Sequence, residues 1–329
     1  MSEVDWKRRP EGGGRGAIRL IAAIARYGGR GVSRLCLYPI TLYFLLMRGA
    51  ERNASRAFLS RVHGRPASLA EVARHIHTFA ATILDRVFML GGRMRLFDIH
   101  NVGLEQLHAA MDQGRGVLVF GSHLGSFDAL RALGRQRPDI QLRVLLDKAH
   151  NPAITEVLAE LDPVLAAGII DAGQDGPSIV MAIKQALEEG ALVAMLVDRA
   201  RPGEPSVAAP LLGTPAPFPT APWLIAAVLK VPVVLAFGLY RGGNRYDLVF
   251  EAFDDVVEIP RRERAGALAQ LVQRYAARLE SRLRSAPYNW FNFYDFWHAD
   301  DHAFPAPVDP ARTPAADLQH GPDSLGERP

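Results

Sequence analysis

The alternation of apolar runs and amphipathic segments after residue 115 predicts an α/β protein. Short apolar runs, each of a length that suits a buried strand, occupy residues 117–120, 142–146 and 191–197. Amphipathic segments with helical signals cover residues 127–137, a stretch that Asn151-Pro152 opens, and residues 177–189 before Gly190. This alternation is typical of a mostly parallel sheet flanked by helices. Two further runs, 231–239 and 246–253, flank a Gly-Gly-Asn turn and predict paired strands, so we expect a mixed sheet.

The N-terminal part predicts helices with one uncharged apolar segment. Residues 50–95 have helical patterns, and Ser68 followed by Glu71 is the signature of a capping box. Residues 35–47 form a run of thirteen uncharged side chains. A spanning helix needs about 20 apolar residues, and Pro39 interrupts this run, so an interfacial segment fits better. Together with residues 17–25 the run predicts a surface that lies on a membrane, and the alternative is a buried hairpin that caps the domain.

Charge and cysteine content narrow the function classes. The net charge of the 329-residue chain is +3, but residues 1–65 hold thirteen Lys or Arg against four Asp or Glu. Because these arginines flank apolar runs, they favour an anionic membrane face as partner. No nucleic-acid-binding motif accompanies them, and we expect no nucleic-acid partner. Cys36 is the single cysteine, and the polar start shows no secretory signal, so a cytoplasmic location is the default.

The same patterns predict four regions along the chain. We expect a flexible N-terminus over 1–15, a helical membrane-associating region over 16–100, an α/β catalytic domain over 101–300 and a disordered proline-rich tail over 301–329. Within the catalytic domain, residues 258–285 predict a helix that stacks Arg274, Arg278 and Arg282 on one face. That face is either solvated or a dock for an acidic protein or an anionic lipid.

The candidate chemistry lies in the loop after residues 117–120. His123 lies in the loop, and Asp128 follows in the first turn of the next predicted helix, with Ser126 as its N-cap. Five residues of continuous helix would rotate the two side chains about 140° apart, so only the loop allows them to meet. Asp128 would then hold the imidazole in one tautomer, and His123 would act as a base. The alternative is that His123 satisfies loop carbonyls and Asp128 is an ordinary first-turn acid.

The glycine frame of the loop, the ends of the strands and the spacing of two other histidines indicate which kinds of site are expected. A nucleophile elbow has Gly-x-Ser-x-Gly, whereas residues 121–125 place histidine at the serine position, which favours a base over a protein nucleophile. In parallel sheets ligands bind beyond the carboxyl ends of the strands, where His123, Asp147 and Asp198 are expected. His75 and His77 lie two apart and point in different directions on a helix, so we expect core or surface histidines and no metal site.

These residues resemble the lipid A biosynthesis acyltransferases, within the wider lysophospholipid and glycerol-phosphate acyltransferases. Residues 121–128, Gly-Ser-His-Leu-Gly-Ser-Phe-Asp, fit the family's His-x4-Asp/Glu catalytic motif. The resemblance continues through Asn151-Pro152, the Val-Asp-Arg-Ala-Arg-Pro-Gly block at 197–203, the proline-rich block at 210–223, and the segments 231–234 and 287–290. It extends over about residues 15–297.

The resemblance implies a reaction and roles for individual residues. It implies transfer of a fatty acyl group from a thioester, on acyl carrier protein or coenzyme A, to a lipid or glycolipid acceptor, without a resident cofactor. His123 would be the general base and Asp128 its partner. Residues expected to bind donor or acceptor are Asp198, Arg199, Lys148, Gly121, Ser122, Gly125 and Phe218, with small residues around Phe218 leaving room for an acyl chain. Backbone N–H groups between Gly121 and Gly125 are candidate oxyanion donors.

The resemblance also implies where the protein acts, and this sequence differs from the family pattern at two places. Acyl carrier protein and anionic lipids are the expected partners, at the cytoplasmic face of the inner membrane, with peripheral or monotopic attachment. Family members have an arginine near Asn151-Pro152 where this chain has Lys148, a point charge, and the ending 288–297 is unusually aromatic. A thioesterase or lipid esterase, with His123 activating water, and a non-catalytic lipid- or carrier-binding protein are the alternatives.

Overall fold

A seven-stranded mixed sheet forms the centre of the computed structural model, which describes residues 29–130, 141–149, 152–200 and 203–297. Its strands are β1 (Asp98–Val102), β2 (Val117–Gly121), β3 (Leu142–Leu146), β4 (Ile169–Asp171), β5 (Leu192–Leu196), β8 (Val233–Gly242) and β9 (Arg245–Asp254). They are ordered β1-β9-β8-β2-β5-β3-β4, and every neighbouring pair is parallel except β8 with β9. The predicted mostly parallel mixed sheet is therefore confirmed, and the pattern missed the short strands β1 and β4.

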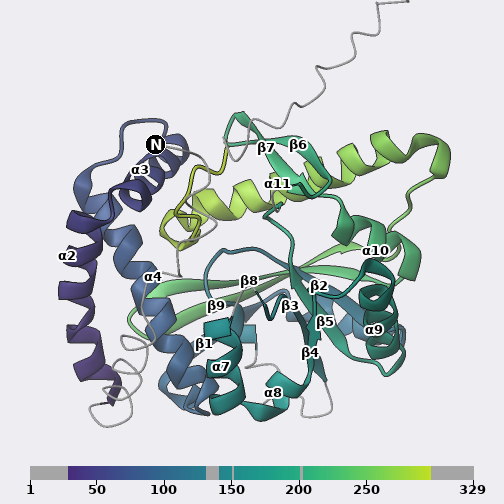
Figure 1. The fold of residues 1–329 in the computed structure, drawn as a ribbon, viewed down its shortest axis with the longest axis horizontal. Helices are drawn as coiled ribbons and strands as arrows, with labels where there is room; N and C mark the ends of the chain where they lie inside the picture. The colour runs from purple at the N-terminus through teal and green to yellow at the C-terminus, as the bar shows by residue number, and fades with distance from the viewer. Residues whose placement is uncertain (1–28, 131–140, 150–151, 201–202, 298–329) are drawn as a thin grey trace, which may run out of the picture. The chain divides into compact units, whose positions relative to one another are not determined.

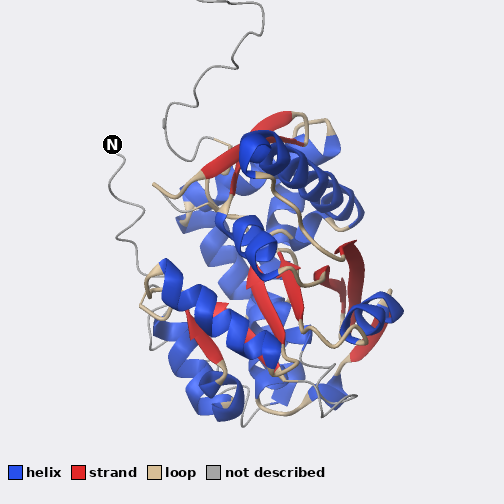
Figure 2. Ribbon diagram, turned by 90° about the vertical axis from the view of Figure 1, so that its right-hand side faces the viewer, coloured by secondary structure: helices blue, strands red, loops and turns tan. Residues whose placement is uncertain are grey.

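Helices cover both faces of this sheet, and each face has its own core (Figures 1 and 2). The helices that follow the strands are α5 (Leu104–Met111), α7 (Pro152–Leu161), α8 (Pro163–Ala167), α9 (Gly176–Glu188), α10 (Ala221–Leu229) and α11 (Arg264–Ser285). Strand β2 shows the alternation most clearly, because Leu118 and Phe120 join one core while Val117 and Val119 join the other. A strand buried on both faces explains why its sequence is a continuous apolar run.

In the described part of the chain, the helical residues 29–35 and the helices α2 (Leu37–Met47), α3 (Gly49–His63) and α4 (Leu69–Leu90) precede the sheet. The capping box at the start of α4 is confirmed, because the Ser68 side chain accepts from the Glu71 amide and the Glu71 carboxylate accepts from the Ser68 amide. Across the described residues, we find no helix with both the length and the apolar character to span a membrane. The predicted segments 1–15, 17–25 and 301–329 lie outside the described residues.

A proline-rich hairpin packs against the last long helix. Strands β6 (Ser206–Leu211) and β7 (Thr214–Pro219) pair with each other outside the main sheet, and β6 lies against α11. The arginines predicted to stack on α11 do so, but acids on β9 neutralise them: Arg274 pairs with Asp254, while Arg278 and Arg282 pair with Glu251. These ion pairs lower the net positive charge of the face, and the dock for an acidic protein or an anionic lipid stays a prediction.

Candidate active site

The loop after β2 places His123 beside Asp198, an acid that was predicted to bind the acyl donor or the acceptor. In the register between β2 and β5, Gly121 lies opposite Leu196, so two residues further along His123 lies opposite Asp198. The His123 Nδ1 atom lies 2.7 Å from the Asp198 Oδ1 atom. Parallel neighbouring strands thus deliver the histidine and the carboxylate to the same sheet edge.

Asp198 is completely buried and is held by several N–H donors. Both of its oxygens accept from the His123 backbone amide, at 3.1 and 3.0 Å, and Oδ2 also accepts from the Trp290 indole Nε1 at 3.1 Å. Burial works to raise the pKa of this carboxyl, but His123, the neighbouring Arg199 and these hydrogen bonds outweigh it and set the pKa at about 2. Asp198 is consequently an ionised acceptor that fixes the imidazole by Nδ1.

The imidazole of His123 is arranged as a neutral base. Burial lowers its pKa from the usual 6.5, the Arg199 and Arg86 guanidiniums lower it further, and Asp198 opposes them. Its side chain is 28% exposed, and the structure shows Nε2 in no hydrogen bond with the described residues. With Nδ1–H donating to Asp198, the lone pair of Nε2 is the free basic position.

Asp128 does not contact His123, which corrects the predicted pair. Asp128 lies in a short 3-10 turn, Phe127–Leu130, and its carboxylate accepts from the Arg86 Nε atom of helix α4 at 2.5 Å. The predicted cap is also absent, because the Ser126 hydroxyl is buried without a hydrogen-bond partner in the described structure. The remainder of the predicted helix, residues 131–137, lies outside the described residues. Arg86 was not predicted, because it is distant in the chain and lies within an ordinary amphipathic helix.

The glycine frame of the loop serves packing more than oxyanion binding. The Gly125 amide donates to Asn289 O at 2.7 Å and the Ser126 amide donates to Gly238 O at 2.7 Å. Gly125 has φ +79°, and a Cβ there would lie 2.0 Å from Gly238 O. The amides of Gly125 and His123 are thus both occupied, so neither is available to an oxyanion, and the predicted oxyanion donors are limited to the other amides between Gly121 and Gly125.

Two other predicted positions have structural roles. The Ser122 hydroxyl is buried and lies 2.7 Å from the Tyr275 hydroxyl of α11, away from any open surface. Gly121 ends β2 where a Cβ would lie 2.9 Å from the Phe127 ring, so the ring occupies the space that a side chain would need. Neither residue presents a side chain to a substrate.

The other residues predicted to bind donor or acceptor are Arg199, Phe218 and Lys148, and only Arg199 lies next to His123. Arg199 follows Asp198, and its guanidinium donates to Asn292 Oδ1 at 2.5 Å and to Phe291 O at 2.9 Å, which keeps a cation next to the histidine. Phe218 of β7 is fully buried against Tyr275 and Phe296, so the expected space for an acyl chain around it is filled. The Lys148 amide donates to the Asp171 carboxylate, beyond the end of β3, which β5 separates from β2.

The aromatic C-terminal segment is part of the site. Leu124 and Trp290 form an antiparallel bridge, in which Phe291 N donates to His123 O at 2.8 Å. The backbone carbonyl of Trp290 accepts from His75 Nε2, and His75 is a fully buried core histidine whose pKa burial lowers to about 4. The segment therefore ties α4, the His123 loop and Asp198 together, which the sequence did not reveal beyond its aromatic content.

A family model for bacterial lipid A biosynthesis acyltransferases matches residues 68–299, well over half of the chain. The chain belongs to this family. A search of curated proteins found no match. The matched range begins at the N-cap of α4 and includes every residue of the site described above, so the lipid A acyltransferase family supplies the reaction class, acyl transfer on a lipid, and a membrane-associated biosynthetic setting.

Membership gives the geometry a specific meaning. The family motif His-x4-Asp is present as His123 and Asp128, yet the carboxylate at the imidazole belongs to Asp198 and the motif's own acid belongs to an ion pair with Arg86. In this member of the lipid A acyltransferase family, Asp198, Arg199 and Arg86 therefore act on His123 from different elements, and Asp128 is the ion-pair partner of Arg86.

Proposed function

We propose that this protein moves a fatty acyl group from an acyl thioester to a lipid or glycolipid acceptor, with His123 as general base and Asp198 as the carboxylate that orients it. The observation that carries the proposal is the 2.7 Å contact between His123 Nδ1 and Asp198 Oδ1, which leaves Nε2 free on a partly exposed ring. A histidine with one nitrogen fixed and a lowered pKa is suited to accept a proton at neutral pH.

The proposed reaction proceeds by direct attack. His123 Nε2 takes the proton of the acceptor hydroxyl or amine as its oxygen or nitrogen bonds to the thioester carbonyl carbon. The tetrahedral intermediate carries its negative charge on the former carbonyl oxygen, and the cations of Arg86 and Arg199 near His123 favour that charge. Collapse breaks the carbon–sulfur bond, and the leaving thiolate takes the proton from His123, so the products are an acyl lipid and a free thiol.

Donor and place of action complete the proposal. Acyl carrier protein and coenzyme A present the same kind of thioester, and because that bond carries the activation, the proposed reaction uses no resident metal or cofactor. We place it at the cytoplasmic face of the inner membrane, with anionic lipids as neighbours and peripheral or monotopic attachment. The family's lipid chemistry and the arginine-rich N-terminal part of the chain support this location.

The test follows the acyl group. The full chain is incubated with vesicles of bacterial lipid extract and a radiolabelled acyl thioester, on acyl carrier protein in one series and on coenzyme A in another. We expect label in a lipid with the wild type and none with His123→Ala. His100→Ala, which removes an exposed histidine on β1, is the matched control and keeps full activity.

The same assay identifies the result that overturns the proposal. Label released as free fatty acid at equal rates with and without lipid would make the protein a thioesterase. A donor that binds without turnover, across both carriers and all lipid fractions, would make it a binding protein. If the His123→Ala variant still transfers label to lipid, His123 is not the general base.

A further inference from the structure

Helix α2 and the helical residues 29–35 before it expose a continuous apolar face. Every exposed residue from 32 to 47 is apolar, tyrosine or proline; they are Val32, Leu35, Tyr38, Pro39, Leu42, Tyr43, Leu46 and Met47. Apart from the proline, these side chains are between 52% and 68% exposed. A helix on a water-facing surface normally directs charged residues outward, and contiguous apolar patches mark interaction surfaces.

The opposite face of the same segment attaches it to the domain. Arg30, Arg34, Leu37 and Thr41 are spaced by four, three and four residues, which places them on one stripe. Leu37 and Thr41 are buried, and the Thr41 hydroxyl lies 3.1 Å from His77 Nδ1 of α4. The stripe therefore determines which face of the segment is left outside.

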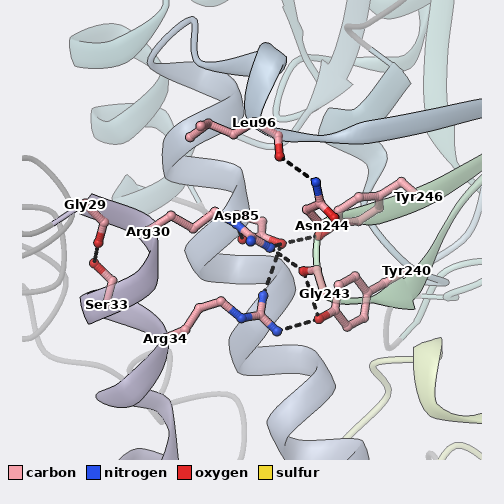
Figure 3. Close-up of polar contacts among 10 residues, drawn as sticks. All are labelled: Gly29, Arg30, Ser33, Arg34, Asp85, Leu96, Tyr240, Gly243, Asn244 and Tyr246. Carbon is pink, nitrogen blue, oxygen red and sulfur yellow. Dashed lines mark hydrogen bonds and ion pairs between the residues drawn. The ribbon is translucent and has the colours of Figure 1, made fainter.

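A buried carboxylate fixes this orientation (Figure 3). Asp85 of α4 is completely buried, and its Oδ1 and Oδ2 atoms accept from Arg30 Nε at 2.8 Å and Arg30 Nη2 at 2.9 Å. Arg34 Nη1 lies 3.6 Å from the same Oδ2 atom. Both arginines also bind the β8–β9 hairpin: Arg30 Nη2 donates to Gly243 O, and Arg34 Nη2 donates to the Tyr240 hydroxyl at 2.6 Å. Two cations on one helical face, held by one buried acid, prevent the segment from rotating about its axis.

The charges and aromatic residues of the segment indicate the partner. Residues 29–48 contain no Asp or Glu that would repel an anionic head group. Arg30 and Arg34 share the single carboxylate of Asp85, which leaves one net positive charge there, and Arg48 pairs with Glu51. Tyr38 and Tyr43 stand on the exposed face, and tyrosine is enriched where an apolar region meets lipid head groups. The eleven residues of α2 extend for roughly 16 Å, about half of a bilayer's hydrocarbon core, so a helix lying in the plane of the interface fits them.

We propose that the outward face of α2 docks into the headgroup layer of an anionic lipid bilayer, and that Asp85, by holding Arg30 and Arg34, sets the face that docks. This deepens the membrane location proposed above and rests on it for its biological setting, but it requires nothing of the acyl-transfer chemistry. The segment is thus an interfacial anchor whose rotation is locked to the domain that contains His123.

The test compares outward and control substitutions in a vesicle flotation assay with the full chain. The vesicles consist of phosphatidylcholine, with or without phosphatidylglycerol. We expect the wild type to float with the anionic vesicles and the double variant Leu42→Ser, Leu46→Ser to bind at least about tenfold more weakly, because two leucines that the bilayer would bury are lost. The matched control is Met181→Ser with Val228→Ser, which removes equally exposed apolar side chains from α9 and α10 and leaves binding unchanged.

A second measurement reports the face itself. Cys36 is the single cysteine, so Cys36→Ser with Leu42→Cys carries one environment-sensitive dye on the face, and Cys36→Ser with Val228→Cys carries it elsewhere. We expect the dye at 42 to enter an apolar environment on the anionic vesicles and the dye at 228 to stay in water. Circular dichroism and thermal unfolding confirm that each variant is folded.

Three outcomes of these measurements overturn the inference. A wild type that does not float, or a Leu42, Leu46 variant that floats as well as the control, shows that this face does not bind lipid. A wild type that is dimeric in sedimentation, and that the same variant makes monomeric without any vesicle binding, assigns the face to a second copy of the chain. Wild-type flotation without movement of acyl label leaves this inference intact and overturns only the proposed function.

Discussion

At the scale of single residues, the carboxylate of Asp198 binds the imidazole of His123, and the carboxylate of Asp128 binds Arg86. His123 was predicted as the base from its place in the loop that follows a strand and from the His-x4-Asp spacing of the family that the sequence resembles. Asp128 was chosen for being close in the chain, whereas Asp198 reaches the imidazole because its strand is the neighbour of β2. Arg86 and Trp290 were not predicted at all, since their roles depend on contacts between distant elements.

The two acids should differ in how much activity they support. We expect Asp198→Asn to lower kcat by about 10²–10⁴-fold, because the amide cannot hold the Nδ1–H tautomer as a carboxylate does. Asp128→Asn removes the partner of Arg86 and leaves the His123 contact in place, so its loss should be at least about tenfold smaller. Steady-state kinetics of acyl transfer measure both variants. A larger loss for Asp128→Asn would show that this acid reaches His123 during turnover.

The charge of Arg86 should be visible in the pH profile. Since the base must be neutral, activity rises with pH through the pKa of His123, which lies below 6.5 in the wild type. Arg86→Met removes a cation that lowers this pKa, so the acidic limb of kcat/KM should move to higher pH. Asp198→Asn removes a carboxylate that raises the pKa, so the limb should move to lower pH.

The control for this pair keeps the charge. Arg86→Lys retains a cation beside the imidazole and should leave the acidic limb within a few tenths of a pH unit of the wild type, roughly the effect of a small displacement of one charge. Arg199, the other cation near His123, is unchanged in all three variants. An acidic limb that stays fixed in Arg86→Met would reduce Arg86 to a structural partner of Asp128.

At the scale of elements, strand existence was predictable and strand order was not. Continuous apolar runs predict strands inside a sheet, and β2, β3 and β5 were found by this signal, whereas β8 and β9 were found as two runs that flank a Gly-Gly-Asn turn. The three-residue strand β4 is too short to leave a pattern, and the alternating strand β1 at the sheet edge resembles a polar loop. Order and register are set by packing between elements, which explains why the pairing of His123 with Asp198 could not be predicted.

The His123 loop contacts β8 at two glycines, Gly125 in the loop and Gly238 in the strand, and neither position has space for a Cβ atom. A Cβ at Gly238 would lie 2.0 Å from Ser126 O, with backbone on both sides of the clash. We expect Gly238→Ala to lower the free energy of unfolding by about 3 kcal/mol or more, because neither chain has room to move. Urea denaturation measures this loss.

Gly176, which has open space around it, gives the matched control for Gly238→Ala. Gly176 begins α9, where an added Cβ would meet nothing within 4 Å, so Gly176→Ala should change stability by less than about 1 kcal/mol. Equal stabilities of the two variants would mean that the loop separates easily from β8. The activity of His123 would then not depend on this contact.

At the scale of the whole molecule, one buried acid joins parts that are far apart in the chain. Asp85 links Arg30 near the start of the described residues, its own helix α4, and the Tyr246 hydroxyl of β9 at 2.9 Å. The sequence predicted an apolar, arginine-flanked segment here but left open whether it is a buried hairpin or a membrane surface. The structure shows why both descriptions had support, since one face of the segment is clamped to the domain and the other is exposed.

This clamp should carry a large share of the stability of the N-terminal helices. Asp85→Ala leaves the Arg30 guanidinium, with only 16% of its side chain exposed, without its acid, and removing one partner of a buried pair costs about 3–5 kcal/mol. We expect that loss in urea denaturation, whereas Asp255→Ala, at an exposed acid, should cost less than about 0.5 kcal/mol. If Asp85→Ala unfolds at the wild-type urea concentration, α2 is held by Leu37 and Thr41 alone, and the orientation of its apolar face is not set by charge.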